Sequence, residues 1–433
     1  MNKLSYIKTF SKIRFNPTDP EIEDIKIEDI AHALSFMCRA NGHFSQFFSV
    51  AQHSLNCAYE AAARGLSKKI QLACLIHDAS EAYLSDITRP VKINLPEYRR
   101  FEDKLQNMIY DKFLNESLTD NDINEIKKID NTMLYYEFLE LMDEKIFDTE
   151  PELKSSPLMK HSDFTEIEIR FLTEFNRLTT GVVNRYFPDK PFISVGIDGC
   201  IGKWAAVAIT NNKFEVCLCK NILEICEKFS MAQSIIIDMP IGLAENSDDI
   251  RPDSILRKNL KGKASSVFNT PCRQAVHAPN YTDAIAENKK ALNCSISPLS
   301  NSIIPKIREI DIFLQGNEAF KNRLVESHPE YCFALLNGGN PILSNKTTYE
   351  GKKARLELLS KYYADSFWVL EEFRKSAPAL SNKTDDIIDA LSMAVIGALG
   401  LRYGFKTLPQ NPQKDSVGLY MQILGANIPD EVK

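Results

Sequence analysis

The feature that most constrains this 433-residue chain is an abrupt change of hydrophobic pattern near residue 190. Before that point, apolar residues recur at helical spacing and strand signals are nearly absent. At RYFPDKPFISVGIDG, two prolines flank a short polar link, and a run typical of β-strands follows. A chain of this length exceeds the usual size of one hydrophobic core. We therefore predict an all-α domain over residues 1–188 and an α/β domain over residues 192–433.

The second half carries the pattern of an α/β domain. The runs FISVGID, KWAAVAIT and FEVCLCK predict three strands, NILEICEKF predicts a helix, and SIIIDMP predicts a fourth, buried strand. Residues 244–264 are polar and charged, so we expect a long loop there. A further helix is predicted to begin at Thr384.

Composition places the chain among ordinary globular proteins. A net charge of −6 gives no global electrostatic reason for tight, sequence-independent DNA binding. No apolar run reaches the length of a signal peptide or a membrane span, so we expect a cytoplasmic protein with no membrane partner. The ten cysteines show no disulfide or zinc spacing. The oligomeric state stays open, with a homo-oligomer as one alternative.

Polar residues interrupt three apolar helical stripes in the first half. His53 lies early on a helix that begins after Ser49, and His77, followed at once by Asp78, lies on a helix predicted to begin after Ser67. A third helix, from about Ile123, has the apolar stripe Ile123, Ile126, Met133 and Leu134, and Asp130 interrupts it. Burying two acids without cations costs several kcal/mol, and no Arg or Lys on these stripes is placed to pair with them. A bound divalent metal would remove that cost.

The order H…HD…D in this helical setting resembles the HD superfamily of metal-dependent phosphohydrolases. The likeness runs through IEDIAHALSFMCRANGHFSQFFSVAQHS, LIHDASEAYLSDITRPVK and IKKIDNTM, and the middle segment is most similar to the branch that includes 5′-deoxynucleotidases. The resemblance implies that one divalent metal, Mn, Co, Ni, Fe or Zn, is held by His53, His77, Asp78 and Asp130. It also implies acid/base roles for Glu81 and Asp86, and substrate contacts from Arg39, His43 and Lys92.

Acidic residues also gather in the second half. Asp198 and Asp238 each end an apolar strand, where α/β sheets usually place ligand sites. The helix from Thr384 adds Asp386 and Asp389, three residues apart on one face. Neighbouring carboxylates repel one another unless a cation lies between them or their pKa values rise.

This half resembles the domain-of-unknown-function family 429, described as predicted nucleases with an RNase H-like fold. The matching segments are VGIDGCIGKWAAVAI, IIIDMPIGL, SSVFNTPCRQAV, KIREID, VESHPEYCFALLNGG, SNKTTYEGKKARLELL and DDIIDAL. The resemblance implies Mg or Mn ions held by Asp198, Asp238, Glu326 and either Asp386 or Asp389, with His328 and Glu330 as neighbouring alternatives. Arg273 and Lys346 would contact phosphate.

We therefore expect a bifunctional phosphate-ester hydrolase, with a nucleotide as substrate of the first domain and DNA or RNA as the candidate partner of the second. One alternative keeps the first enzyme and makes the second domain a non-catalytic nucleic-acid or partner-binding module. Another makes the first domain a triphosphatase, a cyclic-nucleotide hydrolase or an alarmone hydrolase.

Overall fold

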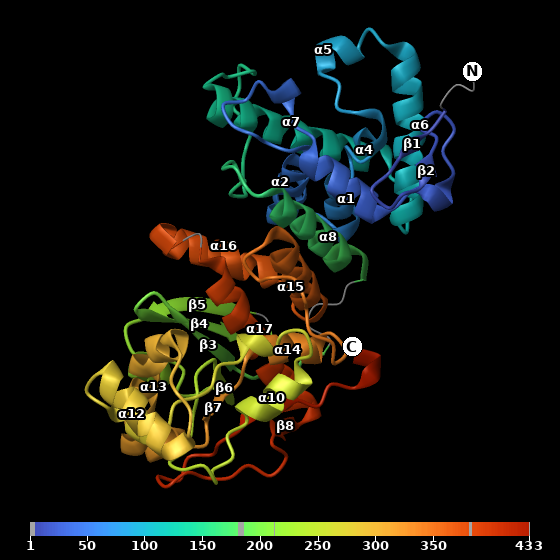
Figure 1. Cartoon of the computed structure of the whole chain (residues 1–433). Coiled ribbons are helices and arrows are strands. Elements are labelled where there is room, and N and C mark those ends of the chain that lie inside the picture. The colour runs from blue at the N-terminus through green and yellow to red at the C-terminus, as the bar shows by residue number, and fades with distance from the viewer. Residues whose placement is uncertain (1–4, 181–185, 212, 381–382, 433) are drawn as a thin grey trace. The chain divides into compact units, whose positions relative to one another are not determined.

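The computed structural model describes residues 5–180, 186–211, 213–380 and 383–432. The chain divides into two compact units, Met1–Val182 and Val183–Lys433, called here the N-terminal and C-terminal units (Figure 1). The first is helical and the second is built on a mixed β-sheet. Within the described ranges, no helix combines the length and apolarity needed to cross a membrane.

Helices build almost the whole N-terminal unit. A short antiparallel pair, β1 (Ile7–Lys8) and β2 (Arg14–Phe15), precedes them. The helices are α1 (Ile27–Phe36), α2 (Val50–Ala63), α3 (Lys68–Leu75), α4 (Glu81–Leu84), α5 (Arg89–Lys92), α6 (Pro96–Phe113), α7 (Asp120–Met142) and α8 (Phe164–Thr180). Their apolar faces meet in one core to which α1, α2, α3, α6, α7 and α8 contribute.

Side-chain caps define where two of these helices begin. The Ser49 hydroxyl accepts from the backbone N–H of Gln52 at 3.1 Å, and the Ser67 hydroxyl accepts from that of Ile70 at 3.3 Å. Both predicted starts are confirmed, because each cap satisfies an N–H group that the first helical turn leaves unpaired.

Two details of the helical prediction are wrong. The helix α3 ends at Leu75, so His77 and Asp78 lie in the turn that follows it. Consecutive helical residues point about 100° apart, and leaving the helix lets both side chains reach one site. Ile123 is 51% exposed at the start of α7, because the first turn of that helix extends beyond the core.

The C-terminal unit is organised around a five-stranded sheet. Its strands are β3 (Ser194–Cys200), β4 (Lys203–Ile209), β5 (Phe214–Cys219), β6 (Ser234–Ile237) and β7 (Leu324–Glu326), in the order β5-β4-β3-β6-β7. The first three form an antiparallel meander, and β6 and β7 run parallel to β3. The four predicted strands are confirmed, whereas the three-residue β7 was too short for the sequence pattern to predict.

Helices cover both faces of this sheet. The helices of this unit are α9 (Ile222–Lys228), α10 (Asp253–Asn259), α11 (Arg273–His277), α12 (Tyr281–Leu292), α13 (Pro298–Gly316), α14 (Pro329–Leu336), α15 (Tyr349–Tyr362), α16 (Ser366–Ser376) and α17 (Thr384–Tyr403), followed by the strand pair β8 (Phe405–Leu408) and β9 (Ile423–Ala426). The loop predicted over residues 244–264 is wrong in part, because α10 forms within it. The buried Arg251 anchors this segment to Glu326 of β7 at 2.8 Å.

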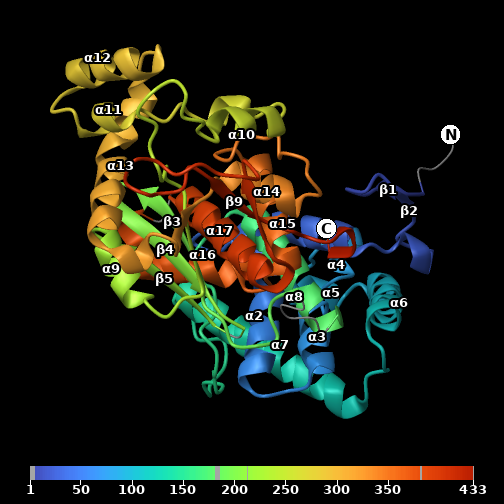
Figure 2. The same ribbon diagram turned by 90° about the horizontal axis from the view of Figure 1, so that it is seen from below.

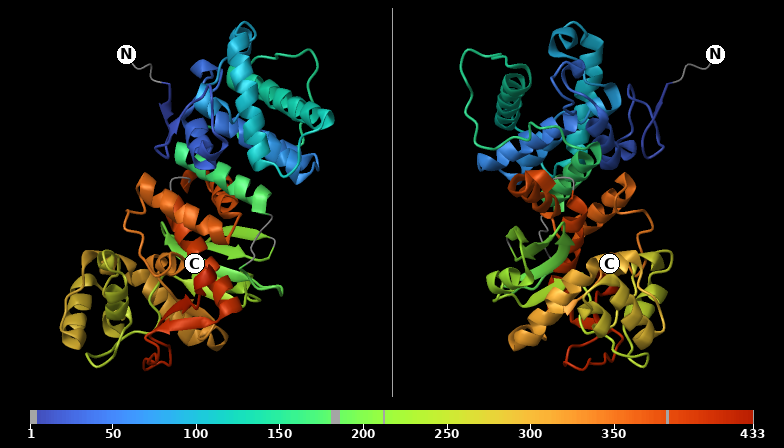
Figure 3. Two further views of the ribbon diagram at one scale, coloured as in Figure 1. Left: turned by 90° about the vertical axis from the view of Figure 1, so that its right-hand side faces the viewer. Right: turned by 60° about the vertical axis from the view of Figure 1, so that its left-hand side comes forward.

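The faces of the sheet pack against different helices. Apolar residues of α9 and α13 share a core with one face, while α17 lies along the other (Figures 2 and 3). The close approach of α17 depends on Gly196 in β3. A Cβ atom at this position would lie 1.9 Å from the carbonyl oxygen of Ala390. No other amino acid could occupy position 196 without moving the helix.

Candidate active sites

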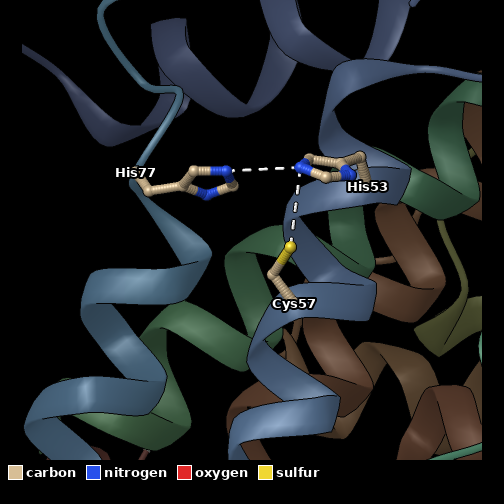
Figure 4. Close-up of side chains that lie close together, drawn as sticks. All are labelled: His53, Cys57 and His77. Atoms are coloured by element: carbon tan, nitrogen blue, oxygen red, sulfur yellow. Dashed lines mark hydrogen bonds between the residues drawn. The ribbon is translucent and has the colours of Figure 1, made fainter. Parts of the chain in front are cut away.

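Two histidines and two aspartates converge in the N-terminal unit. The Nε2 atom of His53 lies 3.3 Å from Nε2 of His77 (Figure 4). It also lies 3.3 Å from Oδ1 of Asp130, and Nε2 of His77 lies 3.4 Å from Oδ2 of Asp78. Ligand atoms about 2.1 Å from a tetrahedral metal are separated by about 3.4 Å. The structure therefore brings the four predicted ligands together at a spacing that suits one metal ion.

Hydrogen bonds on the far side of each ring orient the two imidazoles. Nδ1 of His53 lies 2.6 Å from Oε1 of Glu137, and Nδ1 of His77 lies 2.8 Å from the carbonyl oxygen of Cys74. Both partners are acceptors, so each Nδ1 donates its proton to its partner, and each Nε2 faces the point where the four side chains converge. Partners of this kind fix the tautomer of metal-binding histidines.

Glu137 is a site residue that the sequence reasoning missed. It is fully buried on α7, and its second oxygen accepts from Nε of Arg39 at 3.1 Å. Seven residues, or two helical turns, separate it from Asp130, so both acids lie on one face of the helix. An acid repeated at this spacing in a largely apolar stretch was the signal available in the sequence.

Cys57 is a second residue that was not predicted. It lies one turn after His53 on α2, with Sγ 3.5 Å from Nε2 of that histidine. His53, Cys57 and His77 together form a group that could hold a metal ion (Figure 4). Burial raises the pKa of the Cys57 thiol to about 11, so the neutral thiol is the form expected near pH 7.

Both aspartates have cationic neighbours, although none of these lies on the three apolar stripes. Nη1 of Arg39 lies 3.2 Å from Oδ2 of Asp78, and Nη2 of Arg89 lies 3.3 Å from Oδ2 of Asp130. The two arginines lie outside the three stripes, Arg39 after α1 and Arg89 at the start of α5. A comparison limited to residues on the same helices could not find them.

A cavity of about 590 Å³ opens beside this site. The predicted residues that line it are Arg39, His43, Asp78, Glu81, Asp86, Lys92 and Asp130.

Burial, followed by repulsion from Asp78 and Asp86, raises the pKa of Glu81 well above its usual range. Nζ of Lys92 donates to one Glu81 oxygen at 3.3 Å, while the buried Oε2 atom has no hydrogen-bond partner in the described part of the chain.

The acids of the C-terminal unit meet at the carboxyl end of the sheet, around a cavity of about 420 Å³. Asp198 ends the apolar run of β3, Asp238 directly follows β6, and Asp389 reaches the cavity from α17. Burial, then repulsion from the other two acids, raises the pKa of Asp198 well above its usual range. Burial also raises the pKa of Asp389 to about 6, although Nζ of Lys346 lies 2.5 Å from its Oδ2.

Glu326 lines this cavity, and other groups hold both of its carboxylate oxygens. Its two oxygens accept from Arg251 at 2.8 and 3.0 Å, and one of them also accepts from the backbone N–H of Ile241. A carboxylate held on both oxygens by a buried guanidinium is already neutralised. Asp386 is also placed differently from Asp389, since it does not line the cavity.

Arg273 does not line this cavity. Its guanidinium forms ion pairs with Glu245, Asp311 and Asp415. These acids come from distant parts of the sequence, so the local motif around Arg273 could not reveal them. With ion pairs to three carboxylates, this arginine joins distant segments and stabilises the fold.

Comparisons with known proteins found relatives and a family. The chain is 42% identical over 110 residues to the uncharacterized protein YfdR of Escherichia coli K12, which is 25% of this chain and 59% of that protein. It is 36% identical over 116 residues to an uncharacterized protein of Rhodobacter capsulatus, which is 26% of this chain and 59% of that protein. The chain thus spans 59% of the length of each of these relatives. Residues 196–414, half of the chain, match the family described as "Protein of unknown function (DUF429)", and the chain therefore belongs to that family.

Proposed function

We propose that this protein is a bifunctional phosphate-ester hydrolase, in which the N-terminal unit is an HD-type nucleoside 5′-monophosphate phosphohydrolase. The observation that carries this proposal is the convergence of two imidazole Nε2 atoms and two carboxylates, 3.3–3.8 Å apart, at the edge of the 590 Å³ cavity. A cavity of that size can enclose a nucleotide.

The donor set of the N-terminal site fits a divalent metal. Mixed imidazole and carboxylate ligands suit Mn, Co, Ni, Fe or Zn better than Mg. His53, His77, Asp78 and Asp130 would hold the ion, and Glu137 keeps the His53 lone pair directed at it. When bound, such an ion lowers the pKa of water and neutralises charge on phosphate.

The other cavity residues would act directly on the substrate. Arg39 presents a guanidinium that Glu137 and Asp78 hold in place, which suits it to grip phosphate oxygens. The raised pKa of Glu81 favours its protonated form, so this carboxyl can supply a proton to the leaving 5′-oxygen. Asp86 and Lys92 also line the cavity, where the lysine adds positive charge.

A substrate screen tests this half of the proposal. Deoxy- and ribonucleoside mono-, di- and triphosphates would be incubated with Mn²⁺, Co²⁺, Ni²⁺ or Mg²⁺, beside the Asp78→Ala variant. We expect orthophosphate from monophosphates, and no release by the variant. Release of tripolyphosphate would favour a triphosphatase instead, and cleavage of cyclic nucleotides or alarmones would favour those hydrolases. Activity that survives Asp78→Ala would show that this site does not catalyse the reaction.

For the C-terminal unit we propose an RNase H-like nuclease that uses Mg²⁺ or Mn²⁺. A sheet with an antiparallel three-stranded meander followed by two parallel strands supports this, as does the acid cluster at its carboxyl end. Asp198, Asp238 and Asp389 are the proposed ligands, and Lys346 balances part of their charge. Two ions in such a site would stabilise the attacking and leaving oxygens of a phosphodiester.

The alternative for this unit is a binding module without catalysis. Cleavage of labelled DNA and RNA would be measured with each metal, for the unaltered chain and for Asp198→Asn. Cleavage that the substitution abolishes supports the nuclease. Binding without any cleavage supports the module.

A further inference from the structure

The segment KIREID, residues 306–311, is not explained by either proposed reaction. It lies on α13, and three of its four charged side chains have clear structural partners. Arg308 donates to the carbonyl oxygen of Val276, and Glu309 accepts from Nε1 of Trp204 at 3.0 Å. Asp311 binds Arg273, as described above. Lys306 alone of the four lines the 420 Å³ cavity of the C-terminal unit.

The position of Lys306 is set by three neighbours. Its Nζ atom lies 3.7 Å from the centre of the Trp204 ring and donates to the backbone carbonyl oxygen of Lys203 at 2.6 Å. Its side chain also covers Gly199, where an added Cβ would lie 3.1 Å from the Cε atom of the lysine. The ammonium is thus held beside the strand end that carries Asp198.

Lys306 differs from the other cations around this site in lacking an acidic partner. Lys346 binds Asp389, and Arg251 binds Glu326. In the described ranges of the chain, Lys306 forms no ion pair with a carboxylate, and one carbonyl oxygen satisfies only one of its three donors. An ammonium placed over an aromatic ring has lost some of its bound water molecules, and a bound anion can take the place of that water.

We propose that Lys306 binds a backbone phosphate of a single nucleic-acid strand at the C-terminal site, with Trp204 and the Lys203 carbonyl holding it in position. This role rests on the proposed nuclease function and names the contact that Arg273 does not provide. The acids would hold the metal ions on the side of β3 that faces α17. Lys306 would bind the nucleic acid from the side that faces α13.

The chain supplies its own reporter for this contact. It has two tryptophans, so a Trp368→Phe background leaves Trp204 as the sole emitter. A phosphate that draws the ammonium from the ring changes Trp204 emission without any need for cleavage. The probe is a short oligodeoxynucleotide with Ca²⁺ in place of Mg²⁺, and the same oligonucleotide with a neutral methylphosphonate backbone is the control ligand.

Matched variants separate charge from packing. Lys306→Met keeps the aliphatic stem over Trp204 but removes the ammonium, and Lys306→Arg restores a cation. Lys203→Met removes an exposed charge at the same end of β4, while the backbone carbonyl stays. Affinities are measured by anisotropy of a labelled oligonucleotide across a range of salt concentrations.

We expect Lys306→Met to weaken phosphodiester binding about tenfold and to lower the salt slope by about one. Lys306→Arg should recover most of the affinity, and Lys203→Met should show no such loss. For the methylphosphonate ligand, the unaltered chain and Lys306→Met should have equal affinities. Equal binding by the unaltered chain and Lys306→Met would overturn the role of Lys306 alone. A chain that binds no oligonucleotide under any condition would overturn the nuclease proposal together with this contact.

Discussion

The substitution Glu137→Gln tests whether a buried carboxylate orients the proposed metal site. Both neighbours of Glu137, Nδ1 of His53 and Nε of Arg39, are hydrogen-bond donors. A glutamine has one acceptor oxygen and one donor amide, so it can satisfy only one of the two and turns its N–H groups toward the other. Loss of such a partner costs about 10–100-fold in metal affinity, or about 1.4–2.7 kcal/mol.

The same substitution also removes a charge from the core. Breaking a buried ion pair costs about 3–5 kcal/mol, and we expect the lower end because Arg39 keeps its contact with Asp78. Titration calorimetry with Co²⁺ or Mn²⁺ measures the affinity, and chemical denaturation of the metal-free chain measures the stability. Glu140→Gln, an exposed change on the same helix, is the matched control. Unchanged metal affinity in Glu137→Gln would refute the argument that this residue orients His53.

Three further predictions concern the two sites and the sheet. Asp78→Ala should reduce Co²⁺ binding in calorimetry by at least about tenfold, since one of four ligands is lost, and unchanged binding would exclude it from the site. The raised pKa values of Asp198 and Asp389 make the metal-free fold less stable as pH rises from about 4 toward those values, because the unfolded chain loses its protons first. Mg²⁺ or Mn²⁺ should therefore raise the melting temperature more at about pH 7.5 than at about pH 5.5, and an equal rise would contradict this. Gly196→Ala should lower the free energy of unfolding of the C-terminal unit by about 3 kcal/mol or more, measured with denaturant, because α17 must move. The control Gly316→Ala should cause no such loss, because its added Cβ has no atom within 4 Å.

Local sequence was a reliable guide where local physics decides the structure. The hydroxyls of Ser49 and Ser67 cap the helices that follow them, and the apolar runs after residue 192 form strands. Each of these features depends on residues within a few positions of one another.

Local sequence could not predict contacts between segments that are far apart along the chain. Arg89 reaches Asp130 across 41 positions, and Arg251 reaches Glu326 across 75. Both pairings place a cation against a predicted ligand. Lys306 lies in the segment KIREID, but no role was predicted for it, since a lysine on an amphipathic helix is usually a solvated surface residue.

The sequence by itself determined that the chain has a helical half and a strand-rich half, that His53, His77, Asp78 and Asp130 are candidates for one site, and that acids end the central strands. Only the tertiary structure decided which cationic side chains lie against each of these acids. The physical reason is that a charge in a protein interior is set by whichever groups surround it in space. Those groups are brought together by the packing of helices and strands, and the spacing of residues along the chain does not encode them.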